Sequence, residues 1–188
     1  PGLLLILGAW LLLFLKGRIK RVVMLLLPAA ALLDCLFMTP GTYGVVSFLE
    51  QNLVFGRVDS LSLVFSYVFS LIAFIGMVYA FHVDDDAEHV TALTYAGGAL
   101  GVTFAGDFLS LYIFWELMAV SSVLLIWRHR KASAVSAGFR YLMVHLVGGL
   151  ILLAGIVLHL SQTGSLAFGD MRTASSGAWG LILVGFLL

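Results

Sequence analysis

The sequence predicts an all-α protein, a polytopic bundle of about seven transmembrane helices. Of its 188 residues 62% are hydrophobic and only 11% are charged, whereas a soluble domain carries about 25% charged residues. The apolar residues form continuous runs without the alternation of a β-barrel, as helices in lipid require. This composition excludes a soluble enzyme, a nucleic-acid-binding protein and a disordered chain.

Seven apolar segments lie between the charged residues. The first and last are shorter than the roughly 20 residues that cross a bilayer, so we expect residues 1–188 to be one membrane domain, the N-terminal half of a longer subunit. No cofactor is expected, and the single cysteine, Cys35, excludes a cysteine-based metal cluster. In chain order the segments are residues 3–15, 22–38, 60–82, 90–106, 109–127, 134–160 and 178–188.

The connections between these segments carry turn signals. In residues 39–59, Gly and Pro flank a short amphipathic piece that we expect at the outer surface. The Ser-, Thr- and Gly-rich residues 161–177 are expected to be a similar surface loop. Asp107 precedes the fifth segment and is the expected N-cap of that helix.

Basic residues in the connections predict the orientation. Seven lie in the connections after the first and fifth segments, and only Arg57 and Arg172 lie on the opposite side. Because basic loops stay in the cytoplasm, the protein is expected in the cell inner (plasma) membrane with its N-terminus outside. The seven are Lys16, Arg18, Lys20, Arg21, Arg128, Arg130 and Lys131.

An acidic run, residues 84–88, occupies the third connection on the cytoplasmic side. Acidic residues contribute little to orientation, so the run does not oppose this topology. Carboxylates of this kind bind divalent metals, but their spacing matches no known metal loop. A hydrated turn or a contact with another subunit is the favoured interpretation.

Glu116 is the leading candidate for a functional residue. Inserting an ionisable group into lipid costs roughly 2.5–3.5 kcal/mol of free energy, so such a residue is expected to have a specific role. Glu116 lies nine residues after Asp107 and twelve before Arg128, about 13 and 18 Å from the two ends of its helix. A carboxylate near the midplane is suited to gain and lose a proton; the alternative is a neutral, hydrogen-bonded Glu between helices.

Three further ionisable residues lie within the apolar segments. His145 is expected near the depth of Glu116, on a face of small residues that favours close helix packing, and is either a proton relay or a core histidine. Arg140 enters the same helix about 10 Å from its cytoplasmic end, where it either extends to the surface or holds a carboxylate charge. Asp34, in the second segment, is a weaker candidate.

Two stretches resemble the proton-conducting membrane transporter family. Residues 106–122, GDFLSLYIFWELMAVSS, resemble the fifth-span motif of that family, and residues 138–149, GFRYLMVHLVGG, with the later Thr163-Gly164-Ser165-Leu166, resemble its sixth span and following turn. The family includes antiporter-like subunits of respiratory complex I, the D and A subunits of Mrp-type Na⁺/H⁺ antiporters, and subunits of membrane-bound hydrogenases.

The resemblance implies a proton-translocating subunit in which Glu116 matches the mid-membrane glutamate of the family. That glutamate pairs with a lysine on the next helix, expected just after Leu188, and Arg140 stands where the family commonly has Lys. We therefore predict that Glu116, His145 and Arg140 transfer protons. The implied partners are other membrane subunits, the bilayer, and protons with or without Na⁺.

Other functions remain open from the sequence. By itself the chain is expected to be part of a transporter subunit that does not conduct alone, and whether that subunit serves a larger NADH:quinone oxidoreductase, a hydrogenase or an Mrp complex is undecided. The main alternative is a non-conducting structural subunit that docks its partners. An intramembrane hydrolase is excluded because no paired nucleophile motif is present.

Overall fold

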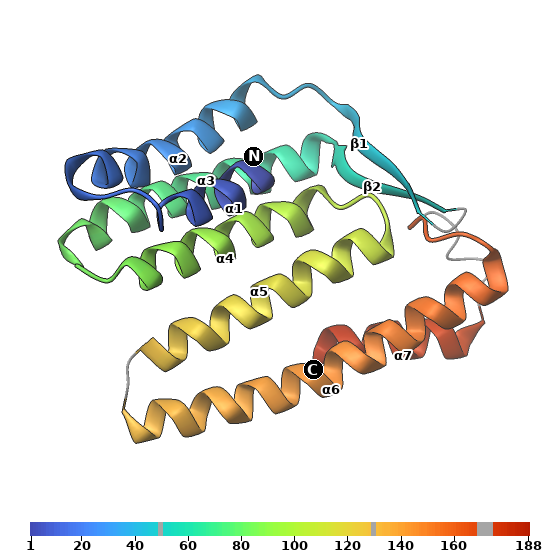
Figure 1. Ribbon diagram of the computed structural model, residues 1–188. Coiled ribbons are helices and arrows are strands. Elements are labelled where there is room, and N and C mark those ends of the chain that lie inside the picture. Colours follow the sequence, from blue (N-terminus) through green and yellow to red (C-terminus); the bar gives the residue numbers. More distant parts are fainter. Residues whose placement is uncertain (49–50, 129–130, 169–174) are drawn as a thin grey trace.

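The computed structural model describes residues 1–48, 51–128, 131–168 and 175–188, which form seven α-helices and one β-hairpin (Figure 1). The all-α class is confirmed, with the hairpin as an addition. The elements are α1 (Gly2–Leu11), α2 (Gly17–Phe37), β1 (Gly41–Phe48), β2 (Gln51–Val58), α3 (Ser60–Tyr79), the 3₁₀ turn η1 (Ala80–His82), α4 (Asp86–Phe104), α5 (Phe108–Arg128), α6 (Ala132–Thr163) and α7 (Ser176–Leu187).

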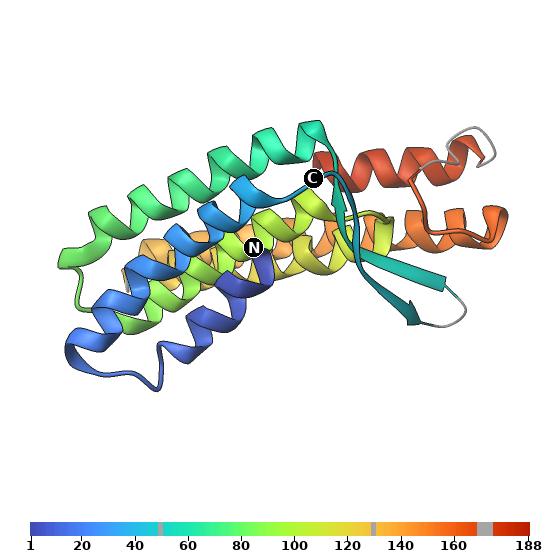
Figure 2. The same cartoon turned by 90° about the horizontal axis from the view of Figure 1, so that it is seen from above.

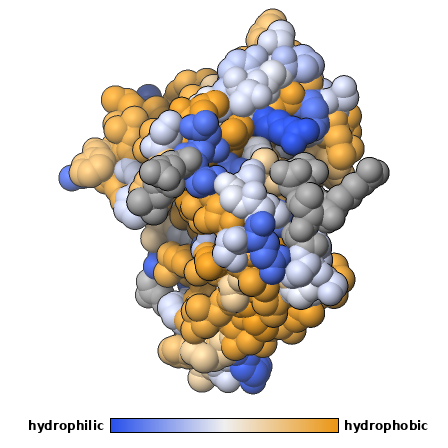
Figure 3. Space-filling view, turned by 90° about the vertical axis from the view of Figure 1, so that its right-hand side faces the viewer, coloured by the Kyte–Doolittle hydropathy of each residue, from blue (hydrophilic) through white to orange (hydrophobic). Residues whose placement is uncertain are grey.

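Among the residues that the structure describes, three helical stretches are long and apolar enough to cross a membrane, by length and composition. They are Ser60–His82, Phe108–Arg128 and Ala132–Thr163, while α1 and α7 are apolar but shorter. Many large hydrophobic side chains on these helices, such as Ile72, Val120 and Leu150, are exposed. Seen from the hairpin end, broad hydrophobic areas alternate with small hydrophilic patches (Figure 3). Such a surface suits a lipid environment.

The helices form two packed groups. Helices α1 to α4 enclose one hydrophobic core, and α5, α6, α7 and β2 contribute to a second. Helix α7 lies beside α6, as both ribbon views show (Figures 1 and 2). Glycines permit the closest approaches: a Cβ at Gly97 would contact α1 at 2.7 Å, and one at Gly155 would contact Ile182 on α7 at 2.8 Å. The packing role expected for these small residues is thereby confirmed.

Residues 41–48 and 51–58 pair as an antiparallel hairpin instead of the expected amphipathic surface segment. Gly41 pairs with Val58 and Phe48 with Gln51. The segment is rich in β-branched and aromatic residues, which favour strands, and pairing between the two strands satisfies their backbone groups. Glu50, part of the amphipathic pattern, lies outside the described residues. Figure 2 shows the hairpin projecting from one end of the helical bundle.

Asp107 caps α5, as predicted, and also anchors the hairpin. Its buried carboxylate accepts hydrogen bonds from Ser110 N at 2.8 Å and from Ser110 Oγ and Val54 N at 2.6 Å each. The neighbouring Phe108 N donates to the carbonyl oxygen of Leu166 at 3.0 Å. The Asp107 carboxylate therefore fixes the start of α5 against β2, and the backbone N–H of Phe108 joins it to the chain after α6.

The acidic run lies at the opposite end of the bundle, beside basic residues. Asp85 pairs with Arg128 at the end of α5, and Asp86 pairs with Lys20. A third pair joins Arg21 and Asp84 at 3.6 Å. No group of three potential metal ligands occurs among the described residues. The run is thus a set of ion pairs between α2, α4 and α5. Two basic residues that were counted for the orientation, Arg130 on the cytoplasmic side and Arg172 on the opposite side, lie outside the described residues.

These ion pairs predict a pH-dependent stability. The hydrogen bond from Arg128 holds the pKa of the Asp85 carboxyl below its ordinary value of 3.8, and backbone N–H groups of Glu88 and Ala87 act in the same direction. A carboxyl with a lowered pKa stabilises the folded state above pH 3.8, and this contribution disappears as the pH falls through the lower folded-state pKa. Asp85→Asn should therefore lower the thermal unfolding temperature at pH 7. The difference from the unmodified protein should shrink below pH 3.8; an equal difference at both pH values would contradict this.

Candidate functional site

Glu116 and His145 meet across the interface between α5 and α6. His145 Nε2 lies 3.8 Å from Glu116 Oε1, and the side chains are 16% and 31% exposed, respectively. At this distance a protonated imidazole and an ionised carboxylate form an ion pair, and a small movement or one water would allow proton exchange between them. Two of the three residues predicted to transfer protons are thus neighbours in space.

Gly149 makes room for the carboxylate. It follows His145 by one helical turn, so both residues lie on the face of α6 that contacts α5. A Cβ atom at this position would lie 2.3 Å from Glu116 Oε1, far closer than van der Waals contact allows. The glycine therefore has a steric function at the site in addition to helix packing.

The facing polar atoms of the pair have no other hydrogen-bond partner among the described residues. Both Glu116 Oε1 and His145 Nε2 are buried. His145 also lines a cavity of about 130 Å³ between α4, α5 and α6, whose polar members include the hydroxyl-bearing Tyr95, Ser122 and Tyr141. This space is large enough to admit water beside the pair.

Two aromatic rings orient the imidazole of His145. Trp115 on α5 and Tyr141 on α6 lie nearly parallel to it, with interplanar angles of 17° and 13° and centroid distances of 6.3 and 5.9 Å. Aromatic faces attract cations, so this environment tolerates a protonated imidazole. Trp115, Tyr141 and Ser122 were not predicted from the sequence, although their helical spacing from Glu116 and His145 could have indicated that they lie near the pair.

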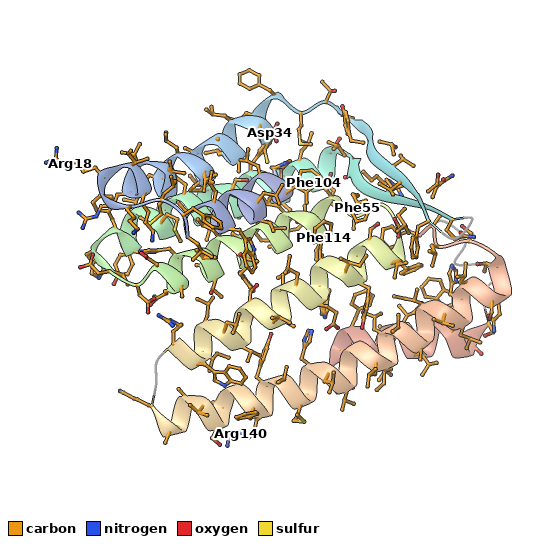
Figure 4. The ribbon with its side chains drawn as sticks, in the orientation of Figure 1. Arg18, Asp34, Phe55, Phe104, Phe114 and Arg140 are labelled. Atoms are coloured by element: carbon orange, nitrogen blue, oxygen red, sulfur yellow. The ribbon has the colours of Figure 1, made fainter. Side chains whose placement is uncertain are left out.

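The structure does not bring Arg140 or Asp34 to this pair. Arg140 is exposed, contacts Ser136 Oγ at 3.4 Å, and points away from α5 (Figure 4). Asp34 lies on α2 with 51% of its side chain exposed. Of the two possibilities left open for Arg140, the structure shows an exposed side chain and no approach to Glu116, in agreement with the roughly 140° between Arg140 and His145 around α6.

His159 on α6 is a further histidine that was not singled out from the sequence. It is fully buried, and neither ring nitrogen has a partner among the described residues. The rings of Phe108 and Trp179 lie 5.2 and 5.6 Å from it, centroid to centroid. His159 follows His145 by fourteen residues, almost four turns, so it lies on nearly the same face of α6 but about 21 Å farther along it.

The part of the chain that holds the pair matches a known family. Residues 105–188 match the family model described as "NADH:quinone oxidoreductase/Mrp antiporter, TM". Residues 105–188 are therefore similar to the membrane region of that family. The match contains Glu116, Gly149 and His145, so the site lies within the family's membrane region. The resemblance inferred from residues 106–122 and 138–149 is thereby confirmed.

Relatives agree with this assignment. The Na(+)/H(+) antiporter subunit A1 of Staphylococcus aureus is 36% identical over 120 residues, which are 60% of this chain and 15% of the relative. One chain of respiratory complex I from Thermus thermophilus superimposes with a TM-score of 0.83 at 23% identity, over 98% of this chain and 41% of that one. A chain of the Mrp complex from Dietzia sp. DQ12-45-1b superimposes with a TM-score of 0.80 at 21% identity, over 98% of this chain and 22% of that one.

The chain is similar in sequence to an Na(+)/H(+) antiporter subunit and shares the fold of chains from complex I and an Mrp complex. The sequence match to the Staphylococcus subunit and the family model support the relationship, and the structural matches show the shared fold. This chain spans less than half the length of each of these three relatives.

Proposed function

We propose that this chain is part of a proton-translocating membrane subunit of a multisubunit cation/proton antiporter or complex I-like assembly. Glu116 is the proton-handling group, and His145 exchanges protons with it. The observation that carries the proposal is the 3.8 Å approach of two ionisable side chains, each with its facing atom buried and without another partner among the described residues. Intramembrane ionisable residues are expensive to insert and mark ion pathways.

The surroundings of the pair support exchange with water. The cavity beside His145 extends toward Ser122 and Tyr141, both of which lie on the basic-end side of Glu116 and His145 along their helices. Protons would reach His145 from that end and pass to Glu116. Arg140 belongs to the proposal as a cation on the basic-end side of the pair. It acts on protons before they reach His145 and does not contact Glu116.

The location and partners follow the same reasoning. We infer a bacterial plasma membrane, with other membrane subunits as partners, protons as cargo, and Na⁺ as the ion named for the Staphylococcus relative. The excess of basic residues at one end supports a cytoplasmic position for that end and an N-terminus outside. Labelling cysteines introduced at Ser165 and Ser133 in a Cys35→Ala background tests this. Residue 165 should react from outside and residue 133 only after permeabilisation; the reverse would overturn the orientation.

The alternative is a structural subunit that docks its partners without conducting protons. The exposed side chains of β1, among them Tyr43, Val45 and Phe48, fit such a role. Proton transport in the complete subunit separates the two possibilities, because a structural subunit does not depend on a buried titratable pair.

His145→Gln is the test that addresses the pair directly. Glutamine keeps the size and hydrogen bonding but cannot carry a proton at neutral pH, so proton uptake into vesicles containing the assembled complex should slow by about 10- to 100-fold. Arg140→Gln should have a smaller effect, since Arg140 does not contact Glu116. Normal uptake by a correctly assembled His145→Gln variant would refute the relay and favour the structural role.

A further inference from the structure

Helix α6 has one long side that neither of the helices packed against it, α5 and α7, covers. Helix α5 packs against the side with His145 and Gly149, and α7 packs against Gly148 and Gly155. With 3.6 residues per turn, Arg140 lies about 140° from His145 and about 60–80° from the two glycines that α7 contacts. Its side chain is exposed and points away from α5 (Figure 4). Arg140 therefore marks the centre of a third, open side of α6.

This open side, which we call the Arg140 face, is apolar apart from Arg140 and two serines. Its residues lie within about 60° of Arg140 around the helix, and the exposed ones are Ser133, Ser136, Arg140, Met143, Val144 and Val147. From Ser133 to Val147 the face extends about 21 Å along the helix axis. Small residues such as serine allow another helix to approach closely. The shape and composition of the face thus suit the packing of a further helix.

Arg140 gives this face a positive charge that nothing in the described part of the chain neutralises. No other Asp, Glu, Lys or Arg occurs among the 32 residues of α6. None of the ion pairs between described residues includes Arg140, whose polar contact is Ser136 Oγ at 3.4 Å. A guanidinium has five N–H donors, so most of those of Arg140 are unused. Charged side chains of membrane helices almost always face other protein and pair with an opposite charge.

The depth of Arg140 favours protein over lipid as the cover of this face. Arg140 lies about 7.5 Å along the axis from His145, which meets Glu116 near the middle of α5. The hydrocarbon core extends about 15 Å from its midplane, so Arg140 starts well inside it, whereas lipid phosphates lie outside it. A carboxylate on a neighbouring helix can lie at the depth of Arg140 and accept two parallel hydrogen bonds from the planar guanidinium.

We propose that the Arg140 face docks a transmembrane helix of a neighbouring membrane subunit, and that this helix carries an Asp or Glu paired with Arg140. Apolar side chains of the same helix contact Val144 and Val147 on one side of the ion pair. Small residues lie opposite Ser133 and Ser136 on the other side. The interaction adds a partner surface to the proposed function, and it holds whether or not the subunit conducts protons.

A photoreactive amino acid in place of Val144 tests the contact in the complete subunit within its purified complex. Irradiation should join residue 144 to another subunit, and mass spectrometry should locate the attachment within about one helical turn of an Asp or Glu in an apolar segment. The matched control carries the same amino acid at Leu146, which is 48% exposed but lies about 160° from Val144 around α6. Residue 146 should not be joined to that helix.

Charge reversal tests the ion pair itself. Arg140→Glu places two like charges at the interface, so the yield of intact complex should fall by about tenfold or more. Arg140→Lys keeps the positive charge and should retain most of the yield. Replacing the carboxylate identified by cross-linking with arginine should restore the yield of the Arg140→Glu complex, which would not happen if that variant merely failed to fold.

The remaining outcomes overturn the proposal. Cross-links from residue 144 only to lipid would show that Arg140 extends to the phosphates at the bilayer surface, and cross-links within the same polypeptide would exclude a partner subunit. An attached segment without a carboxylate, or a charge reversal that restores nothing, would exclude the ion pair. Neither experiment measures proton uptake, so a failure here is distinguishable from a failure of the proposed function.

Discussion

Replacing Glu116 by glutamine in the complete subunit is expected to reduce proton transport by about 100-fold or more while the complex still assembles. Glutamine preserves the size and hydrogen bonding of the side chain, so the packing of α5 against α6 should survive. It removes the only carboxylate beside His145 among the described residues, and with it the group that exchanges the proton. Proton uptake by vesicles containing the purified complex measures the effect.

Two substitutions serve as controls for Glu116→Gln. Glu116→Asp keeps a titratable carboxylate but withdraws it by one methylene from His145, so part of the transport should remain. Asp34→Asn removes a carboxylate from α2 that does not contact the pair, and transport should be normal. If Glu116→Gln assembled and transported like the unmodified protein, the carboxylate would be a packing group.

Gly149→Ala is expected to reduce transport by roughly 10- to 100-fold without altering any ionisable group, since misplacing a reacting group by about 1 Å has effects of this size. The added methyl group would lie 2.3 Å from Glu116 Oε1 and must displace the carboxylate. The same measurement of proton uptake applies. This variant tests the position of Glu116, whereas Glu116→Gln tests its charge.

Gly180→Ala provides the matched control. Gly180 lies on α7, and a Cβ atom there would meet nothing within 4 Å, so the substitution should leave transport unchanged. Comparable losses in both variants would show that alanine impairs the helices in general. Full activity of Gly149→Ala would mean that Glu116 has another working position.

The sequence by itself determined the class of the protein, the order of its helices and the leading candidate residue. Continuous apolar runs between charged residues are a local property, and they located seven helices to within a few residues, although α6 extends from Ala132 to Thr163 where residues 134–160 were expected. Glu116 stood out for the same reason, since a lone carboxylate in an apolar run is unusual whatever surrounds it. The motif around it sufficed to indicate the family.

The tertiary structure decided which of these residues meet. Residues 45–54 contain an amphipathic pattern, but only the pairing of two strands showed that it is a hairpin. Helical spacing could separate Arg140 from His145, yet the contact of His145 with Glu116 depends on how α5 and α6 are rotated against each other, and on the space left by Gly149. The acidic run likewise acquired its partners from α2 and α5. Such contacts join residues distant in sequence, so they depend on packing that no local pattern specifies.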